Sequence, residues 1–79
     1  MYKLYFDQQE CDSDDWGPPH GEYPSLREAM AAAGLPGLEN WNTMRGCPDE
    51  VFTRGKPDWS ILASGAAREF ADLTAAPVA

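Results

Sequence analysis

The stretch YPSLREAMAAAG, residues 23–34, decides the fold because it predicts one helix with a defined start and end. Ser25 is followed three residues later by Glu28, a spacing at which each side chain can satisfy a free backbone N–H of the first turn. Apolar side chains then follow the i, i+3, i+4, i+7 pattern of a buried helical stripe: Leu26, Ala29, Met30 and Ala33. Gly34 suits the left-handed position that follows a helix. We therefore predict a helix from about residue 25 to residue 33.

A strand is predicted before this helix, in the segment YKLYF at residues 2–6. Its side chains alternate with a period of two, which is typical of a strand, and one face carries Tyr2, Leu4 and Phe6. Residues 7–21 are polar, and two successive prolines stiffen this loop near its end. Residues 21–24 could add a short strand that forms a hairpin with residues 2–6.

Two further strands are predicted after the helix, at residues 50–54 and 58–63, around the turn Arg54-Gly55-Lys56-Pro57. In the second of them, Trp59, Ile61 and Ala63 share one face, and Ser60 and Leu62 share the other. Residues 34–50 carry three glycines and two prolines, so we expect an irregular connection held by buried anchors: Leu35, Leu38, Trp41 and Met44.

The last segment admits two readings. Ser64 could cap a helix that places four apolar residues on one side: Ala66, Ala67, Phe70 and Leu73. A final strand through REFADLT is the alternative, and residues 76–79 should fray. The order of elements predicts an α+β fold, with a small antiparallel sheet of three or four strands and one or two short helices packed on one face. Residues 1–79 would form a single compact domain.

The charge of the chain limits its partners. Thirteen acidic residues stand against six basic ones, which gives a formal charge of −7. Such a chain should be repelled by bare nucleic acid and by anionic membranes, and attracted to basic surfaces. The sequence shows neither a signal peptide nor an apolar run near the ~20 residues of a membrane span, so we expect a soluble cytoplasmic protein. We also expect a monomer.

Two cysteines, Cys11 and Cys47, are too few for a disulfide scaffold, and we expect reduced thiols, with a single bridge between them left open. A calcium loop starting at Asp12 fails because Trp16 and Tyr23 occupy positions that require oxygen ligands. A zinc site is not expected either, since Cys11, His20 and Cys47 form no closely spaced ligand pair. We predict no metal and no cofactor.

Catalysis is not expected from this sequence. A nucleophile needs a base beside it, and the single histidine, His20, lies in a proline-flanked loop. No nucleophile elbow and no glycine-rich phosphate loop is present. We therefore predict that the protein is not an enzyme and has no catalytic residues.

The placement of the acidic residues suggests a contact surface. Six of them lie within residues 7–22, and only Lys3 offsets them nearby. Aromatic anchors beside steering charges are typical of interfaces, so the predicted partner-contact residues are Asp7, Glu10, Asp12, Asp14, Asp15, Trp16, Glu22 and Tyr23. Asp49, Glu50 and Asp58 could extend this surface if the second hairpin lies beside it. The alternative is a solvated loop without a partner.

Three segments give the chain a resemblance to a known class of proteins: MYKLYFDQQECDSDDWG, YPSLREAMAAAG and VFTRGKPDWSILAS. In these segments and in its size it resembles the small anti-CRISPR proteins of phages and mobile elements, in particular inhibitors of type I, possibly type I-C, effector complexes. The class has no shared catalytic or metal motif, so no residue role is transferred.

The resemblance implies a non-enzymatic inhibitor in the cytoplasm of a bacterial host. It would bind a basic nucleic-acid-binding surface of the surveillance complex (Cascade), near the region that reads the PAM, and block target DNA partly by acidic, DNA-mimic-like contacts. The alternative function is a small acidic protein-binding module, of the immunity, antitoxin, virion or host-regulatory kind. It would use the apolar surface around Trp41 and Met44, or around Trp59.

Overall fold

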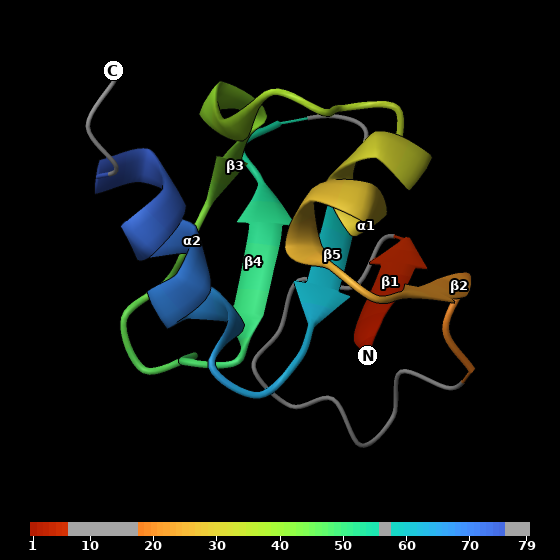
Figure 1. Ribbon diagram of the computed structural model, residues 1–79, viewed down its shortest axis with the longest axis horizontal. Coiled ribbons are helices and arrows are strands. Elements are labelled where there is room, and N and C mark those ends of the chain that lie inside the picture. Colours follow the sequence, from red (N-terminus) through yellow and green to blue (C-terminus); the bar gives the residue numbers. More distant parts are fainter. Residues whose placement is uncertain (7–17, 56–57, 76–79) are drawn as a thin grey trace.

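The computed structural model describes residues 1–6, 18–55 and 58–75, and within them five strands and three helices form (Figure 1). The strands are β1 (Tyr2–Phe6), β2 (Gly21–Tyr23), β3 (Trp41–Asn42), β4 (Glu50–Thr53) and β5 (Trp59–Leu62). The helices are α1 (Leu26–Ala32), the short 3₁₀ helix η1 (Leu38–Asn40) and α2 (Ala66–Ala75). This is the predicted α+β class, with one more strand than the three or four expected.

All neighbouring strands of the sheet are antiparallel, in the order β2-β1-β5-β4-β3. The two edge strands, β2 and β3, are three and two residues long. The predicted hairpin of β1 with β2 is confirmed, with Tyr2 opposite Tyr23, and so is the pairing of β4 with β5. The first and the last strand of the chain, β1 and β5, therefore pair with each other inside the sheet.

The register of the three central strands gives the sheet two distinct faces. Leu4, Ile61 and Val51 lie in one cross-strand row and are fully buried. The neighbouring row contains Lys3, Leu62 and Glu50, and it points to the opposite face because side chains alternate along a strand. The first row belongs to the core, and the second row borders the cavity described below.

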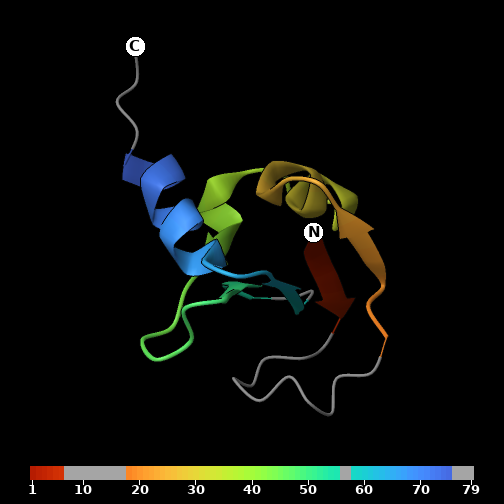
Figure 2. The same cartoon turned by 60° about the horizontal axis from the view of Figure 1, so that its bottom comes forward.

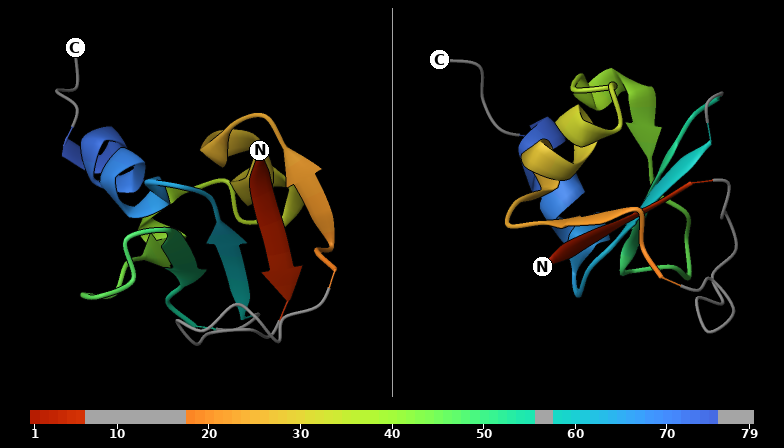
Figure 3. Two further views of the ribbon diagram at one scale, coloured as in Figure 1. Left: turned by 90° about the horizontal axis from the view of Figure 1, so that it is seen from below. Right: turned by 90° about the vertical axis from the view of Figure 1, so that its right-hand side faces the viewer.

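Both helices cover the face that carries the first row (Figures 2 and 3). Helix α1 packs against β1, β2 and β5, and α2 packs against β4 and α1. The buried core comprises Leu4, Leu26, Ala29, Met30, Trp41, Val51, Ile61, Ala66 and Phe70. At roughly 25 cal/mol for each Å² of apolar surface removed from water, this single layer is the main stabilising term of a chain this short.

Helix α1 begins and ends where its sequence predicts. The N–H of Glu28 donates to the hydroxyl oxygen of Ser25 at 3.1 Å, which satisfies one free donor of the first turn. The Glu28 carboxylate accepts from the Ser25 hydroxyl at 2.9 Å instead of from a backbone N–H, so only half of the expected capping box forms. Gly34 takes φ +81°, the left-handed conformation that ends the helix.

The connection after α1 contains a strand that the sequence analysis missed. Trp41 starts β3 and is fully buried, and its indole N–H donates to the carbonyl oxygen of Leu35 at 2.7 Å. Leu35 and Leu38 pack against the core as expected. The prediction of Met44 as a buried anchor is wrong, because its side chain is 44% exposed in the turn that precedes Cys47.

The last segment is helical, so the alternative of a final strand is wrong. Helix α2 buries Ala66 and Phe70, and Leu73 packs against the core from the same side. The carbonyl oxygen of Gly65 accepts the N–H of Glu69 at 3.0 Å, so Gly65 takes the capping position expected for Ser64. The turn residues Lys56 and Pro57, and the tail predicted to fray, lie outside the described residues.

Cys47 is 4% exposed and is disulfide-bonded, so the expectation of a reduced thiol is wrong in this structure. That expectation was based on the compartment and on the cysteine count, neither of which reports the local geometry. Cys11, the only other cysteine of the sequence, lies outside the described residues.

Candidate functional site

Most of the predicted partner-contact residues lie outside the described residues, namely Asp7, Glu10, Asp12, Asp14, Asp15 and Trp16. Glu22 and Tyr23 are described, and both belong to β2. Glu22 is exposed and lies opposite Lys3 in the sheet register. Tyr23 is half-buried and packs against the core. Because neighbouring residues of a strand point to opposite faces, these two do not present one common surface.

The acidic residues proposed to extend that surface have different environments. Asp49 is exposed, and its Oδ1 accepts the N–H of Gly65 at 2.8 Å. Asp58 is half-buried. Glu50 is only 2% exposed, so its assignment as a surface charge is wrong. It is the first residue of β4 and lies opposite Leu62 of β5.

Few carboxylates in the described ranges meet a cation of the same chain. Within residues 1–6, 18–55 and 58–75, the one ion pair joins Arg68 and Asp72, at 4.0 Å and with both side chains highly exposed. Such an exposed pair contributes little to stability. Glu69 accepts a hydrogen bond from the Tyr2 hydroxyl, and this bond is the main reason why the pKa of Tyr2 is raised.

An aromatic cluster lies at the end of the sheet where β1 finishes. The rings of Phe6 and Trp59 meet edge to face with centroids 4.9 Å apart, and His20 contacts Trp59 in the same way at 5.2 Å. The Phe6 side chain is 53% exposed. The indole nitrogen of Trp59 is buried and has no hydrogen-bond partner. This cluster offers a partly exposed apolar surface.

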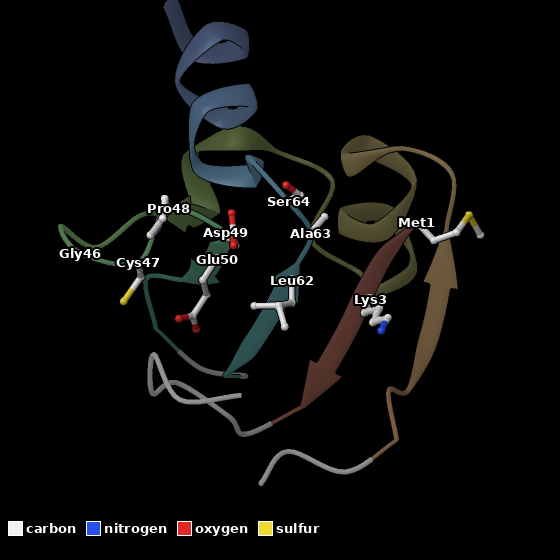
Figure 4. Close-up of a pocket in the computed structure, with 10 residues that line it drawn as sticks. All are labelled: Met1, Lys3, Gly46, Cys47, Pro48, Asp49, Glu50, Leu62, Ala63 and Ser64. Carbon is white, nitrogen blue, oxygen red and sulfur yellow. The ribbon is translucent and has the colours of Figure 1, made fainter. Parts of the chain in front are cut away.

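A cavity of about 430 Å³ opens on the sheet face that the helices leave uncovered (Figure 4). Its size lies within the usual range of about 300–1,000 Å³ for small-molecule sites. Leu62 lies in the middle of the row, with Glu50 on one side and Lys3 on the other. Among the described residues, the lining is Met1, Lys3, Gly46, Cys47, Pro48, Asp49, Glu50, Leu62, Ala63 and Ser64.

Hydrogen bonds fix one wall of this cavity to the start of α2. The N–H of Ala63 donates to the carbonyl oxygen of Asp49 at 3.0 Å, and the N–H of Ala67 donates to that of Pro48 at 3.0 Å. With the bond from Gly65 to the Asp49 carboxylate, three bonds hold the two residues before β4. The wall beside Glu50 is therefore preorganised.

Glu50 is the unusual group of the cavity. Neither of its carboxylate oxygens, both buried, has a hydrogen-bond partner. Burial raises the pKa of the Glu50 carboxyl, and the nearby Ser60 hydroxyl lowers it to a smaller extent. A buried carboxylate without a partner is costly, which marks the site as one that either holds a proton or accepts a cation.

The chemistry that this cavity offers is the binding of a positively charged group by the Glu50 carboxylate. In the described ranges no cluster of three or more histidine, cysteine, aspartate or glutamate side chains could hold a metal ion. The cavity could not be predicted from the sequence, because the segment EVFT shows the alternation of a strand but not which strands lie beside it. The row through Leu62 arises because β5 pairs with β4 on one side and with β1 on the other, and the contact between β1 and β5 joins segments distant in sequence.

None of the described helices has the length and apolar character required to cross a bilayer. Comparison with models of protein families, with curated proteins and with solved structures gives no match to this chain.

Proposed function

We propose that this protein is a non-enzymatic inhibitor that binds a basic, nucleic-acid-binding surface of a larger partner and thereby excludes target DNA. In keeping with the resemblance of its sequence, the partner is a type I CRISPR surveillance complex, and the surface is its PAM-reading, duplex-binding region. Such a region must be positively charged because it holds a nucleic-acid duplex by its backbone.

The observation that supports this proposal is the excess of acidic over basic residues in the sequence. The formal charge is −7, and the described ranges contain a single, exposed ion pair. A surface of this kind is attracted to a basic groove, and the attraction accelerates association and competes with DNA. The acidic residues between Asp7 and Asp15 act as steering charges in this proposal.

The test is a competition assay with a purified type I-C surveillance complex, labelled target DNA and increasing amounts of this protein. We expect the wild type to displace DNA, with an affinity that falls as salt rises. Changing Asp12, Asp14 and Asp15 together to asparagine should weaken inhibition by at least about tenfold, a loss of roughly 1.4 kcal/mol, and flatten the salt dependence.

A matched control separates the position of the charges from their number. Changing Glu28 and Glu39 to glutamine and Asp72 to asparagine alters the net charge by the same amount on the helical layer. This variant should inhibit nearly as well as the wild type. Absence of any binding by the wild-type protein would exclude the proposed partner.

A second candidate function is favoured by the aromatic cluster of Phe6, His20 and Trp59. Exposed aromatic side chains are common anchors of protein interfaces. In this alternative the protein binds a partner through the cluster, and the acidic residues are incidental. The Phe6→Ala variant should then abolish binding, whereas the triple aspartate variant should retain it. Trp41 cannot serve as such an anchor, because it is fully buried.

A further inference from the structure

Glu50 has no charge partner in the described part of its own chain, although it is almost completely buried. Its side chain is 2% exposed, and neither carboxylate oxygen accepts a hydrogen bond. The basic residue that lines the same cavity, Lys3, is two strands away in the cross-strand row, and no ion pair joins them. At a spacing of about 4.8 Å per strand, roughly 10 Å separates the two backbones.

The cavity is large enough for a side chain from another molecule. Its volume is about 430 Å³, and Glu50 lies in its wall with its carboxylate extending from the start of β4 (Figure 4). The neighbouring lining includes Pro48, Leu62 and Ala63, which offer apolar contact to an aliphatic stem. A cation carried on such a stem would satisfy the carboxylate and cover the apolar wall together.

We infer that this cavity receives an arginine side chain of the basic partner, and that the buried Glu50 carboxylate turns toward the cavity to pair with its guanidinium. The inference deepens the proposed function and rests on it, since it names the chemical group by which a basic surface is recognised. Two unpartnered oxygens on one carboxylate match the paired N–H donors of a guanidinium. Arginine is also more weakly hydrated than lysine, so it loses less on entering a buried site.

The other charged groups of the lining are compatible with this assignment. Asp49 adds a second negative charge on the same wall, although its Oδ1 already accepts the N–H of Gly65. Lys3 lies on the far side of Leu62, where it disfavours a second cation. Because burial raises the pKa of the Glu50 carboxyl, the cation competes with a proton for this group, so binding should strengthen as pH rises.

The direct test uses methylguanidinium as the probe and the isolated protein, followed by amide chemical shifts in two-dimensional NMR at constant ionic strength. We expect saturable shifts at Gly46, Asp49, Leu62 and Ala63, with a dissociation constant of the order of millimolar, as is usual for so small a ligand. The amide of Ala31, on the exposed side of α1, should not shift.

Two variants and a second probe decide the outcome. Glu50→Gln should weaken the affinity for methylguanidinium by at least about tenfold, and Glu39→Gln, an exposed carboxylate in η1, should leave it unchanged. Equal shifts in the wild type and in Glu50→Gln, or the absence of saturation, would overturn the inference. An equal response to methylammonium would overturn the choice of arginine.

Failure of the inference and failure of the proposed function can be distinguished with the surveillance complex. If the complex binds the wild type and Glu50→Gln equally well, the proposed function stands and the inference fails. If the complex binds neither, while methylguanidinium still saturates the cavity, the proposed partner is wrong and the arginine preference of the cavity is supported. A loss of complex binding in Glu50→Gln but not in Glu39→Gln supports both.

Discussion

The carboxyl group of Glu50 combines two conditions that rarely coexist, namely burial and the absence of a hydrogen-bond partner. Taking a carboxylate out of water favours its protonated form, which is why burial raises the pKa of this group. In the unfolded chain the same group ionises in the ordinary range of a glutamate. Between these two pKa values the folded protein binds the extra proton, so this residue makes stability depend on pH.

The first prediction concerns Glu50→Gln. The raised pKa stabilises the fold below the unfolded-state pKa, and this contribution is lost as pH rises through the folded-state pKa. The free energy of unfolding of the wild type should therefore fall relative to that of Glu50→Gln as pH rises, by about 1.4 kcal/mol for each pKa unit of the shift. Urea denaturation from acid to neutral pH measures the difference, with Glu39→Gln as the charge control. A constant difference would contradict the prediction.

The second prediction compares two tryptophans. Trp41 donates its indole N–H to Leu35, whereas the buried indole nitrogen of Trp59 has no partner. Trp41→Phe should cost about 2–4 kcal/mol, because it removes buried volume and leaves the Leu35 carbonyl unsatisfied. Trp59→Phe should cost less than about 1.5 kcal/mol, since no hydrogen bond is lost. Urea denaturation followed by circular dichroism measures both, and equal losses would contradict the assignment.

At the scale of single elements, the local signals and the two hairpin pairings could be predicted from the sequence, whereas the pairings of β1 with β5 and of β3 with β4 could not. Helix α1 was predictable because its cap, its stripe and Gly34 all lie within one short segment. Strand β3 was not, because two residues are too few to show alternation and the strand exists only through its pairing with β4. Glu50 was predicted to be a surface charge because the local sequence does not show how deeply a strand residue is buried.

The third prediction tests the end of α1. Gly34 has φ +81°, so Gly34→Ala would force a side chain into the left-handed region and should cost about 1–2 kcal/mol. Gly55 is the matched control, because its φ lies outside that region and a methyl group there would meet no atom within 4 Å. Gly55→Ala should be neutral, or stabilising by less than about 1 kcal/mol. Thermal unfolding of both variants measures the difference, and equal melting temperatures would contradict it.

At the scale of the whole molecule, the fold class is encoded by local segments, whereas the net charge is spread over the whole chain. The α+β class follows from elements that the chain encodes locally, and the structure confirms it. A net charge of −7 acts as a property of the entire surface, and in the described ranges one ion pair brings opposite charges together. Mutual repulsion of the carboxylates should therefore oppose folding at low ionic strength.

The fourth prediction follows from that repulsion. Raising sodium chloride from about 20 mM to about 300 mM shortens the screening length several-fold and should raise the melting temperature. A relief of about 0.5 kcal/mol corresponds to roughly 2–4 °C for a domain of this size. The Arg68→Gln variant, which removes the described ion pair and makes the charge more negative, should show a larger rise. A melting temperature that falls with salt would contradict the prediction.

The brevity of β2 and β3 affects how copies of this protein behave when they are crowded together. A sheet margin recruits another sheet through a ladder of unpaired main-chain groups, and this process begins many fibrils. Margins of three and two residues expose too few of these groups to template a further strand. At high protein concentration the folded protein should therefore form no fibrils that bind thioflavin, even though its sheet contains rows of aromatic and branched side chains.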